Sequence, residues 1–214
     1  MRAISKVFAG IVLGTGMAVA EPVTIAALGD SLTQGYGLAQ EDGFVPQLEG
    51  WLGARGHDVA LINAGVSGDT TAGGLARASW TLTPEVDAMI VALGGNDLLR
   101  GIPFDTSRQN LAGILEAADA AGVEVLLIGL KSPANYGPEF QQAFNAMYPE
   151  LAAQYGTLYH ENFLGALQTE GNSARPDQTF MQRDGIHPTP EGVSLIVEEV
   201  GPQVEALIAR VAER

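Results

Sequence analysis

Five short runs of apolar residues, rich in Val, Ile and Leu, recur along the chain with longer mixed stretches between them. Each run has the length of a strand and is apolar at successive positions, which is typical of a strand buried on both faces of a parallel sheet. The pattern predicts five strands, at residues 23–28, 58–63, 87–93, 123–130 and 157–160.

Three of the intervening stretches repeat apolar residues every three or four positions, as an amphipathic helix does. Start and stop signals flank them: a capping box, a proline in the first turn, and glycines at the end. The predicted helices run from Phe44 to Leu52 before Gly56, from the capping box of Thr106 and Gln109 to Gly122, and from Thr189-Pro190 to Val211.

The alternation of strands and helices predicts an α/β fold. We expect a doubly wound parallel sheet of about five strands between two helical layers, a single three-layer α/β/α domain. The chain contains no internal repeat, low-complexity segment or linker that would divide it. Its two longest irregular stretches, 131–138 and 169–179, are expected to be surface loops.

The first 20 residues have the layout of a secretory signal peptide. Arg2 and Lys6 precede a short apolar stretch that ends in Ala18-Val19-Ala20, a small-residue cleavage pattern. The apolar part is shorter than the roughly 20 residues that span a membrane, which disfavours an uncleaved anchor. We expect cleavage after about Ala20, a periplasmic or secreted domain at 21–214, and no stable membrane anchor after processing.

Composition excludes several classes of function. The 214 residues include no cysteine, which rules out disulfides, thiol catalysis and Cys-ligated zinc. The formal charge is −14, and −16 without Arg2 and Lys6, so nucleic acid and anionic membranes are poor partners. The sequence has no phosphate-binding glycine loop, His-Glu-x-x-His motif or cluster of metal ligands. We therefore expect no cofactor, no metal and no protein partner.

Residues suited to acyl transfer follow three of the predicted strands. Gly29-Asp30-Ser31-Leu32 follows the first, Gly65 the second, and Gly94-Gly95-Asn96-Asp97 the third. The carboxyl ends of parallel strands meet at one edge of the sheet, where such folds bind ligands. Ser31 is therefore a candidate nucleophile. The N–H groups of Ser31 and Gly65 and the side-chain amide of Asn96 are candidate donors to an oxyanion.

A serine nucleophile needs a base, and the chain has three histidines. His57 precedes a strand and is expected at the amino edge of the sheet, while His160 has no carboxylate arranged to orient it. His187 follows Asp184 by three residues. On a tight turn this spacing brings the carboxylate to Nδ1 and leaves Nε2 for the serine. The sequence predicts a catalytic triad of Ser31, His187 and Asp184.

Four blocks, around Ser31, Gly65, Asn96 and His187, resemble in that order the motifs of the GDSL, or SGNH, hydrolase superfamily. The resemblance covers about residues 23–210. It is similar above all to the bacterial branch of acyl-CoA thioesterase I, lysophospholipase and arylesterase. The family has a flavodoxin-like sheet, needs no metal, and hydrolyses esters and thioesters.

Carried over, the family roles fall on the same residues. The resemblance implies that Ser31 is the nucleophile, His187 the base and Asp184 its orienting group, with Gly65 and Asn96 as oxyanion donors. Leu98 departs from the smaller residue usual in the thioesterase branch, which leaves the acyl-chain preference open.

Taken singly, these residues have simpler interpretations. A serine after a strand often caps a helix, and Asp30 and Asp97 are expected to be capping or turn residues. The hydrolase interpretation depends on the co-occurrence of complementary roles. Other serines lack donor groups of this kind beside them and are expected to be structural: Ser67, Ser79 and Ser132.

The segment after Asn96 is apolar and lacks a helical period, so it is interpreted as a loop that lines a substrate pocket. Arg100 within it contacts substrate or forms an ion pair; the sequence leaves both open. The other candidates for pocket lining are Leu98, Leu99, Ile102, Pro103 and Phe104.

These observations predict a serine esterase that forms an acyl-enzyme. Expected substrates are small-molecule or lipid esters: aryl esters, short- to medium-chain acyl esters and lysophospholipids, with thioesters as further candidates. Two alternatives stay open, a polysaccharide O-deacetylase and a non-catalytic secreted binding module on the same fold.

Overall fold

The computed structural model describes residues 21–168 and 176–214. The expected signal peptide, and residues 169–175 of the expected loop at 169–179, lie outside these ranges. In the described part, a five-stranded, fully parallel sheet has the order β2-β1-β3-β4-β5. Its strands are β1 (Val23–Gly29), β2 (Val59–Gly65), β3 (Ala88–Ala92), β4 (Glu124–Ile128) and β5 (Leu158–His160). This confirms the predicted α/β class and all five strands.

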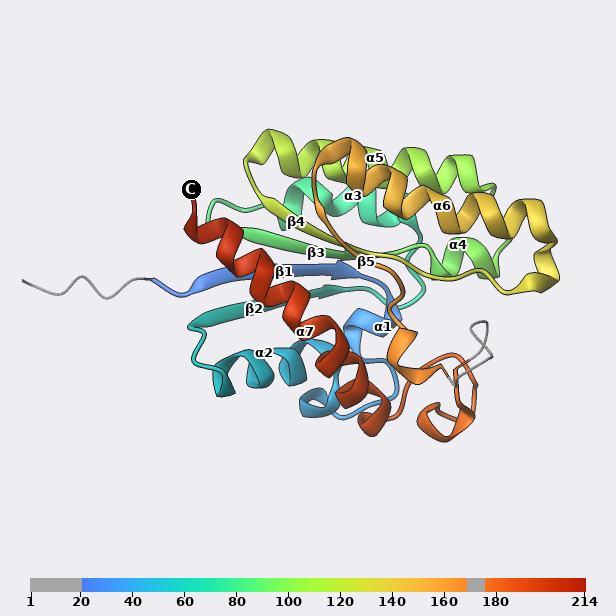
Figure 1. The fold of residues 1–214 in the computed structure, drawn as a ribbon, viewed down its shortest axis with the longest axis horizontal. Coiled ribbons are helices and arrows are strands. Elements are labelled where there is room, and N and C mark those ends of the chain that lie inside the picture. The colour runs from blue at the N-terminus through green and yellow to red at the C-terminus, as the bar shows by residue number, and fades with distance from the viewer. Residues whose placement is uncertain (1–20, 169–175) are drawn as a thin grey trace, which may run out of the picture.

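Helices cover both faces of the sheet, as Figure 1 shows. One face carries α3 (Thr71–Thr81), α5 (Phe104–Ala121) and α6 (Pro138–Tyr155), and the other carries α2 (Phe44–Ala54) and α7 (Pro190–Ala212). Two short helices, α1 (Ser31–Gln34) and α4 (Gly95–Leu99), directly follow β1 and β3. The sequence pattern predicted α2, α5 and α7 and missed the other four. No helix of the described ranges is long and apolar enough to cross a membrane.

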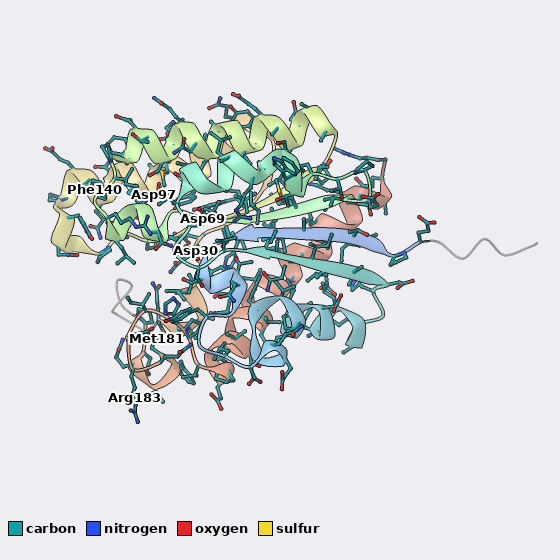
Figure 2. All side chains as sticks on the ribbon, turned by 180° about the vertical axis from the view of Figure 1, so that it is seen from behind. Asp30, Asp69, Asp97, Phe140, Met181 and Arg183 are labelled. Atoms are coloured by element: carbon teal, nitrogen blue, oxygen red, sulfur yellow. The ribbon has the colours of Figure 1, made fainter. Side chains whose placement is uncertain are left out.

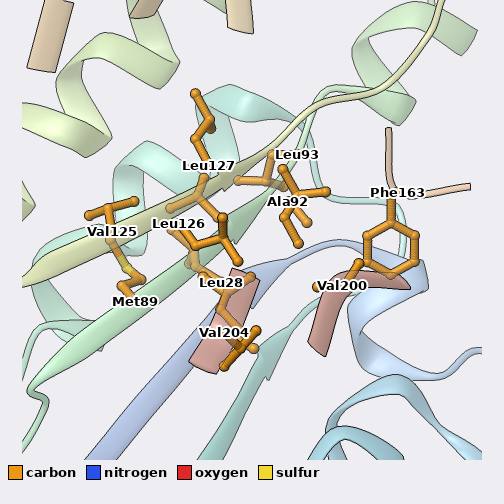
Figure 3. Close-up of a cluster of buried hydrophobic side chains, with 14 of the residues drawn as sticks. Leu28, Met89, Ala92, Leu93, Val125, Leu126, Leu127, Phe163, Val200 and Val204 are labelled. Carbon is orange, nitrogen blue, oxygen red and sulfur yellow. The ribbon is translucent and has the colours of Figure 1, made fainter. Parts of the chain in front are cut away.

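The core lies between the central strands and the helices. Every residue of β3 is buried, and Val200 and Val204 of α7 join the same cluster as Leu28 of β1 (Figure 3). Burial on both faces is the reason for the unbroken apolar runs in these strands. The expected burial on both faces is wrong for β2. It is an edge strand, and Ile62 and Asn63 are exposed.

The start of α5 also differs from the prediction. The helix begins at Phe104 with Pro103 as its N-cap, and the N–H of Thr106 donates to the carbonyl of Pro103 at 2.9 Å. Thr106 therefore lies inside the first turn, where its side chain does not cap the helix. The capping box of Thr106 and Gln109 is wrong.

Asp97 connects three helices instead of capping its own. Its carboxylate is fully buried in α4 and accepts from the backbone N–H and the hydroxyl of Thr71, at 2.9 and 2.5 Å, and from the hydroxyl of Ser107 at 2.9 Å. Thr71 begins α3 and Ser107 lies in the first turn of α5. The position of α4 thus depends on hydrogen bonds to both neighbouring helices.

Asp97→Ala removes the acceptor of these three bonds and leaves buried donors without partners. We expect the free energy of unfolding to fall by about 3 kcal/mol or more. Urea unfolding measures this change. Asp105→Ala is the matched control, because Asp105 is an exposed aspartate at the start of α5, and its loss is expected to stay below about 1 kcal/mol. Equal losses in the two variants would contradict the role given to Asp97.

Candidate active site

The register of β1 brings three strand ends to one level. Gly29 lies opposite Gly65 of β2 and Ala92 of β3. The chain leaves all three strands at the carboxyl edge of the sheet, so the segments that follow them converge. In Figure 2, Asp30, Asp69 and Asp97, which follow β1, β2 and β3, are labelled around this edge.

Ser31 is the first residue of α1, but it does not cap the helix. Asp30 is the N-cap, and its Oδ1 accepts from the N–H of Leu32 at 3.0 Å. The hydroxyl of Ser31 is left to contact Nε2 of His187 at 2.8 Å. The capping function and the reactive hydroxyl are therefore divided between neighbouring residues.

His187 and Asp184 meet on the turn before α7. Nδ1 of His187 lies 2.6 Å from Oδ2 of Asp184, while Oδ1 accepts from the backbone N–H groups of Ile186 and His187 at 2.9 and 3.1 Å. Desolvation raises the pKa of Asp184, but the hydrogen bonds from His187 and Ile186 outweigh it and lower that pKa to about 2. The carboxylate is thus ionised at neutral pH and fixes a proton on Nδ1, which leaves Nε2 free to accept one from Ser31.

Gln182 connects the segment that follows α1 to the turn that carries the histidine, a role that no sequence pattern indicated. Its Nε2 donates to the carbonyls of Tyr36 and Pro188, at 2.9 and 3.0 Å. Tyr36 also packs its ring against His187, with ring centroids 4.7 Å apart. These contacts hold the imidazole in place against the segment that follows Ser31.

Asn96 in α4 faces the serine from the third strand end. Its Nδ2 donates to Oδ2 of Asp30 at 3.3 Å. Burial raises the pKa of Asp30 to about 6, although hydrogen bonds from Leu32 and Asn96 and the charge of His187 lower it. A buried carboxyl group therefore stands between the candidate nucleophile and the candidate oxyanion donor.

Gly65 does not take the position predicted for it. Its N–H donates to Oδ1 of Asn63 at 3.0 Å, and Gly65 borders a different hollow, which is lined by residues of α1, α2 and β2. Gly68, three residues later, lines the same cavity as Ser31 and Asn96 and has a φ of +80°, which favours glycine. Among the described residues, the N–H groups of Ser31 and Gly68 have no hydrogen-bond partner.

The cavity above Ser31 has a volume of about 270 Å³. Its apolar walls are Leu32, Tyr36, Leu99 and Ile186, and the last three are at least 40% exposed. The side of the cavity that holds Leu99 belongs to α4, so the start of the apolar segment after Asn96 is helical. The expected loop is confined to residues 100–103, between α4 and α5.

The other apolar candidates lie elsewhere. Leu98 is buried in the core. Phe104 begins α5 and packs against the core, and Ile102 is half-buried. None of the three borders the cavity. Pro103 is exposed. Arg100 donates to the carbonyl of Gly68 at 2.6 Å and so contacts a wall of the cavity.

The remaining candidates make no contact with the triad side chains. His57 pairs with Glu205 at 2.9 Å, and Nε2 of His160 lies 3.1 Å from the carbonyl of Asn162. The hydroxyl of Ser67 donates to Gln34 at 2.8 Å, that of Ser132 lies 3.3 Å from the carbonyl of Pro133, and Ser79 is exposed on α3. Within residues 21–168 and 176–214, no group of three or more His, Asp or Glu side chains is placed to hold a metal ion.

Comparison with known proteins places this chain in a defined class. Residues 27–195 match the model of the GDSL-like Lipase/Acylhydrolase family. The chain belongs to this family, which confirms the resemblance found in the sequence.

Relatives extend over nearly the whole chain. Esterase TesA of Pseudomonas aeruginosa is 40% identical over 199 residues, 92% of this chain and 94% of the relative. Thioesterase 1/protease 1/lysophospholipase L1 of Escherichia coli K12 is 34% identical over 186 residues, 86% of this chain and 85% of the relative. The crystal structure of the psychrotrophic esterase EstA from Pseudoalteromonas sp. has a TM-score of 0.77 at 30% identity, over 87% of this chain and 98% of that one.

The raised pKa of Asp30 gives a prediction about stability. Its ordinary value is 3.8, so between about pH 4 and 6 the folded protein binds a proton that the unfolded chain has lost. The contribution of Asp30 to the free energy of unfolding therefore falls by up to about 3 kcal/mol as the pH rises from about 4 through 6. Asp30→Asn removes this effect. The difference in unfolding free energy, variant minus wild type, should be more positive at pH 7.5 than at pH 4.5 in urea titrations. A difference that does not change with pH would contradict the assignment.

Proposed function

We propose that the chain is a serine hydrolase of carboxylic esters. The observation that carries the proposal is the continuous chain of contacts from Ser31 to His187 and on to Asp184, at 2.8 and 2.6 Å. Ser31 and His187 are 156 residues apart in the sequence. Family membership and relatives named as esterases support the same conclusion.

Ser31 attacks the ester carbonyl while Nε2 of His187 accepts its proton, and Asp184 stabilises the imidazolium that forms. Negative charge then develops on the carbonyl oxygen. Its donors are the N–H groups of Ser31 and Gly68 and Nδ2 of Asn96, all of which belong to residues that line the cavity. Gly68 replaces Gly65 in this role because its N–H is free to donate.

His187 next protonates the leaving alcohol oxygen, and the acyl group stays on Ser31 as an ester. Water attacks this acyl-enzyme with His187 again as the base, which releases the acid and restores the serine. Every proton in this sequence passes through Nε2 of His187. The tautomer that Asp184 fixes is therefore required in both halves of the reaction.

The small apolar cavity favours short acyl chains or an aryl ring over long chains. A volume of about 270 Å³ lies slightly below the usual range for ligand pockets, and three of its four apolar residues stay largely exposed. The group on the other side of the ester bond would stay near solvent. Among the described residues that line the cavity, Tyr36 is the one Phe, Tyr or Trp, so the lining does not form the row of aromatic side chains that would favour a polysaccharide deacetylase.

We also propose that residues 1–20 are a signal peptide that directs the domain to the periplasm or the medium. The basic residues, the short apolar stretch and the Ala-Val-Ala before Glu21 support this. The mature domain would then act on esters outside the cytoplasm.

Ser31→Ala should lower kcat for a p-nitrophenyl ester by several orders of magnitude while the melting temperature stays unchanged, because the hydroxyl is the attacking group. Steady-state kinetics and a thermal melt measure both. Ser67→Ala is the comparison, since Ser67 lines the same cavity but donates to Gln34. It should keep kcat within about tenfold. Full activity in a folded Ser31→Ala protein would exclude the proposed nucleophile.

Neutral esters should have a higher kcat/KM than acyl-CoA of the same chain length. Without Arg2 and Lys6 of the proposed signal peptide the domain has a formal charge of −16, which repels the polyanionic coenzyme. The difference in kcat/KM between the two substrates should become smaller as salt screens the repulsion, with rate constants measured from about 20 to 500 mM NaCl. Preference for acyl-CoA at every ionic strength would refute this prediction.

A further inference from the structure

Asp30 has two carboxylate oxygens in two different environments. Oδ1 accepts from the N–H of Leu32 at 3.0 Å, which is the capping contact of α1. Oδ2 lies 3.3 Å from Nδ2 of Asn96, across the gap between the ends of β1 and β3. Capping explains the first contact alone. A neutral Asn or Ser caps a helix as well as Asp does, so capping does not require a buried charge here.

The side chain is only 3% exposed, and burial of a carboxylate is unfavourable unless its oxygens are bonded. The approach to α4 is close. A Cβ added at Gly95 would lie 3.3 Å from Oδ2 of Asp30, so glycine keeps this contact open. The N–H of Leu32 therefore fixes one oxygen of the carboxylate, and the absence of a side chain at Gly95 lets the other approach Asn96.

Asn96 needs such a partner because its carboxamide is nearly symmetrical in shape. Nδ2 donates two hydrogens and Oδ1 accepts, and the two ends can exchange by rotation. An ionised carboxylate has no hydrogen to donate, so it can bond to Nδ2 but not to Oδ1. With one Nδ2 hydrogen bonded to Asp30, the second stays available for the cavity.

We propose that Asp30 is a positioning residue whose ionised carboxylate orients Asn96, so that Nδ2 and not Oδ1 faces the substrate's carbonyl oxygen. The proposal rests on the proposed function, in which Asn96 donates to the oxyanion. If the carboxamide rotated, Oδ1 would repel the developing negative charge instead of stabilising it.

Protonation of Asp30 would undo this orientation. A neutral carboxyl group can donate from Oδ2 to Oδ1 of Asn96, which favours the rotated amide. Burial brings this change toward neutral pH, since it raises the pKa of Asp30 to about 6. The titratable groups that face Asp30 are His187 from the turn before α7, Asp69 from the loop after β2, and Tyr148 of α6. His187 lowers the pKa of Asp30 and Asp69 raises it.

The first experiment compares Asp30→Asn with Asn96→Ala. Asn at position 30 keeps the cap but presents an amide that no longer selects Nδ2 of Asn96. We expect both variants to lose about 100- to 1000-fold in kcat with little change in KM, the usual effect of one missing oxyanion donor. The melting temperature of Asp30→Asn at pH 8 should not fall, because a buried charge is removed. If capping is the whole role of Asp30, Asp30→Asn keeps wild-type kcat, and the proposal is wrong.

The double variant separates action through Asn96 from other routes. In the Asn96→Ala background, Asp30→Asn should cause no further loss of kcat, because its target is gone. Multiplied losses would mean that Asp30 acts elsewhere, for example on His187, and would overturn the proposal. Asp87→Asn is the matched control: Asp87 also accepts a backbone N–H, from Thr24 at 2.8 Å, but at the amino edge of the sheet. It should keep wild-type kcat.

A pH series tests the proposal without any change at position 30. The ratio of kcat in wild type to kcat in Asn96→Ala cancels every pH effect that the two proteins share. As the pH falls from 8 to 5, this ratio should decline toward 1. A constant ratio above 100 would refute the role of Asp30 and leave Asn96 as the donor. A ratio near 1 at every pH would show that Asn96 does not donate to the oxyanion. It would refute both the role of Asp30 and the proposed donor role of Asn96.

Discussion

The pairing of β1 with β2 and β3 is the constraint on which the site depends. It sets Gly29 level with Gly65 and Ala92, so the chain leaves three neighbouring strands at one edge. A slip by one residue would turn each side chain of β1 to the opposite face and place Ser31 away from Asn96. The buried apolar residues of β1 and β3 make such a slip costly, and core packing therefore fixes the active-site geometry.

Two buried carboxylates position the residues at this edge of the sheet. Asp97 holds α4 against α3 and α5 with three hydrogen bonds, and Asp30 contacts the neighbouring Asn96 from the β1 side. Asp97 accounts for the stability of this corner, whereas ionised Asp30 opposes folding at neutral pH. A stabilising and a destabilising carboxylate thus meet at the residue proposed as oxyanion donor, where function and stability make different demands.

The sequence predicted the elements with strong periodicity and the residues with distinctive side chains. All five strands, the helices α2 and α7, and the proximity of Ser31, His187 and Asp184 followed from pattern and spacing. The oxyanion glycine did not. Gly65 is still paired in β2, so a free donor had to come from beyond the strand end, and a sequence does not show where pairing stops. Leu98 was misjudged because the five-residue helix α4 is too short to display a period.

Covalent trapping tests the central claim, that Ser31 is the nucleophile of a hydrolase, most directly. A p-nitrophenyl phosphonate ester should add one equivalent to the wild-type protein, and peptide mass spectrometry should place it on Ser31, with activity lost in proportion to labelling. Ser31→Ala should take up no label. Stoichiometric labelling of Ser67 or Ser132 that parallels the loss of activity, with Ser31 unmodified, would contradict the account.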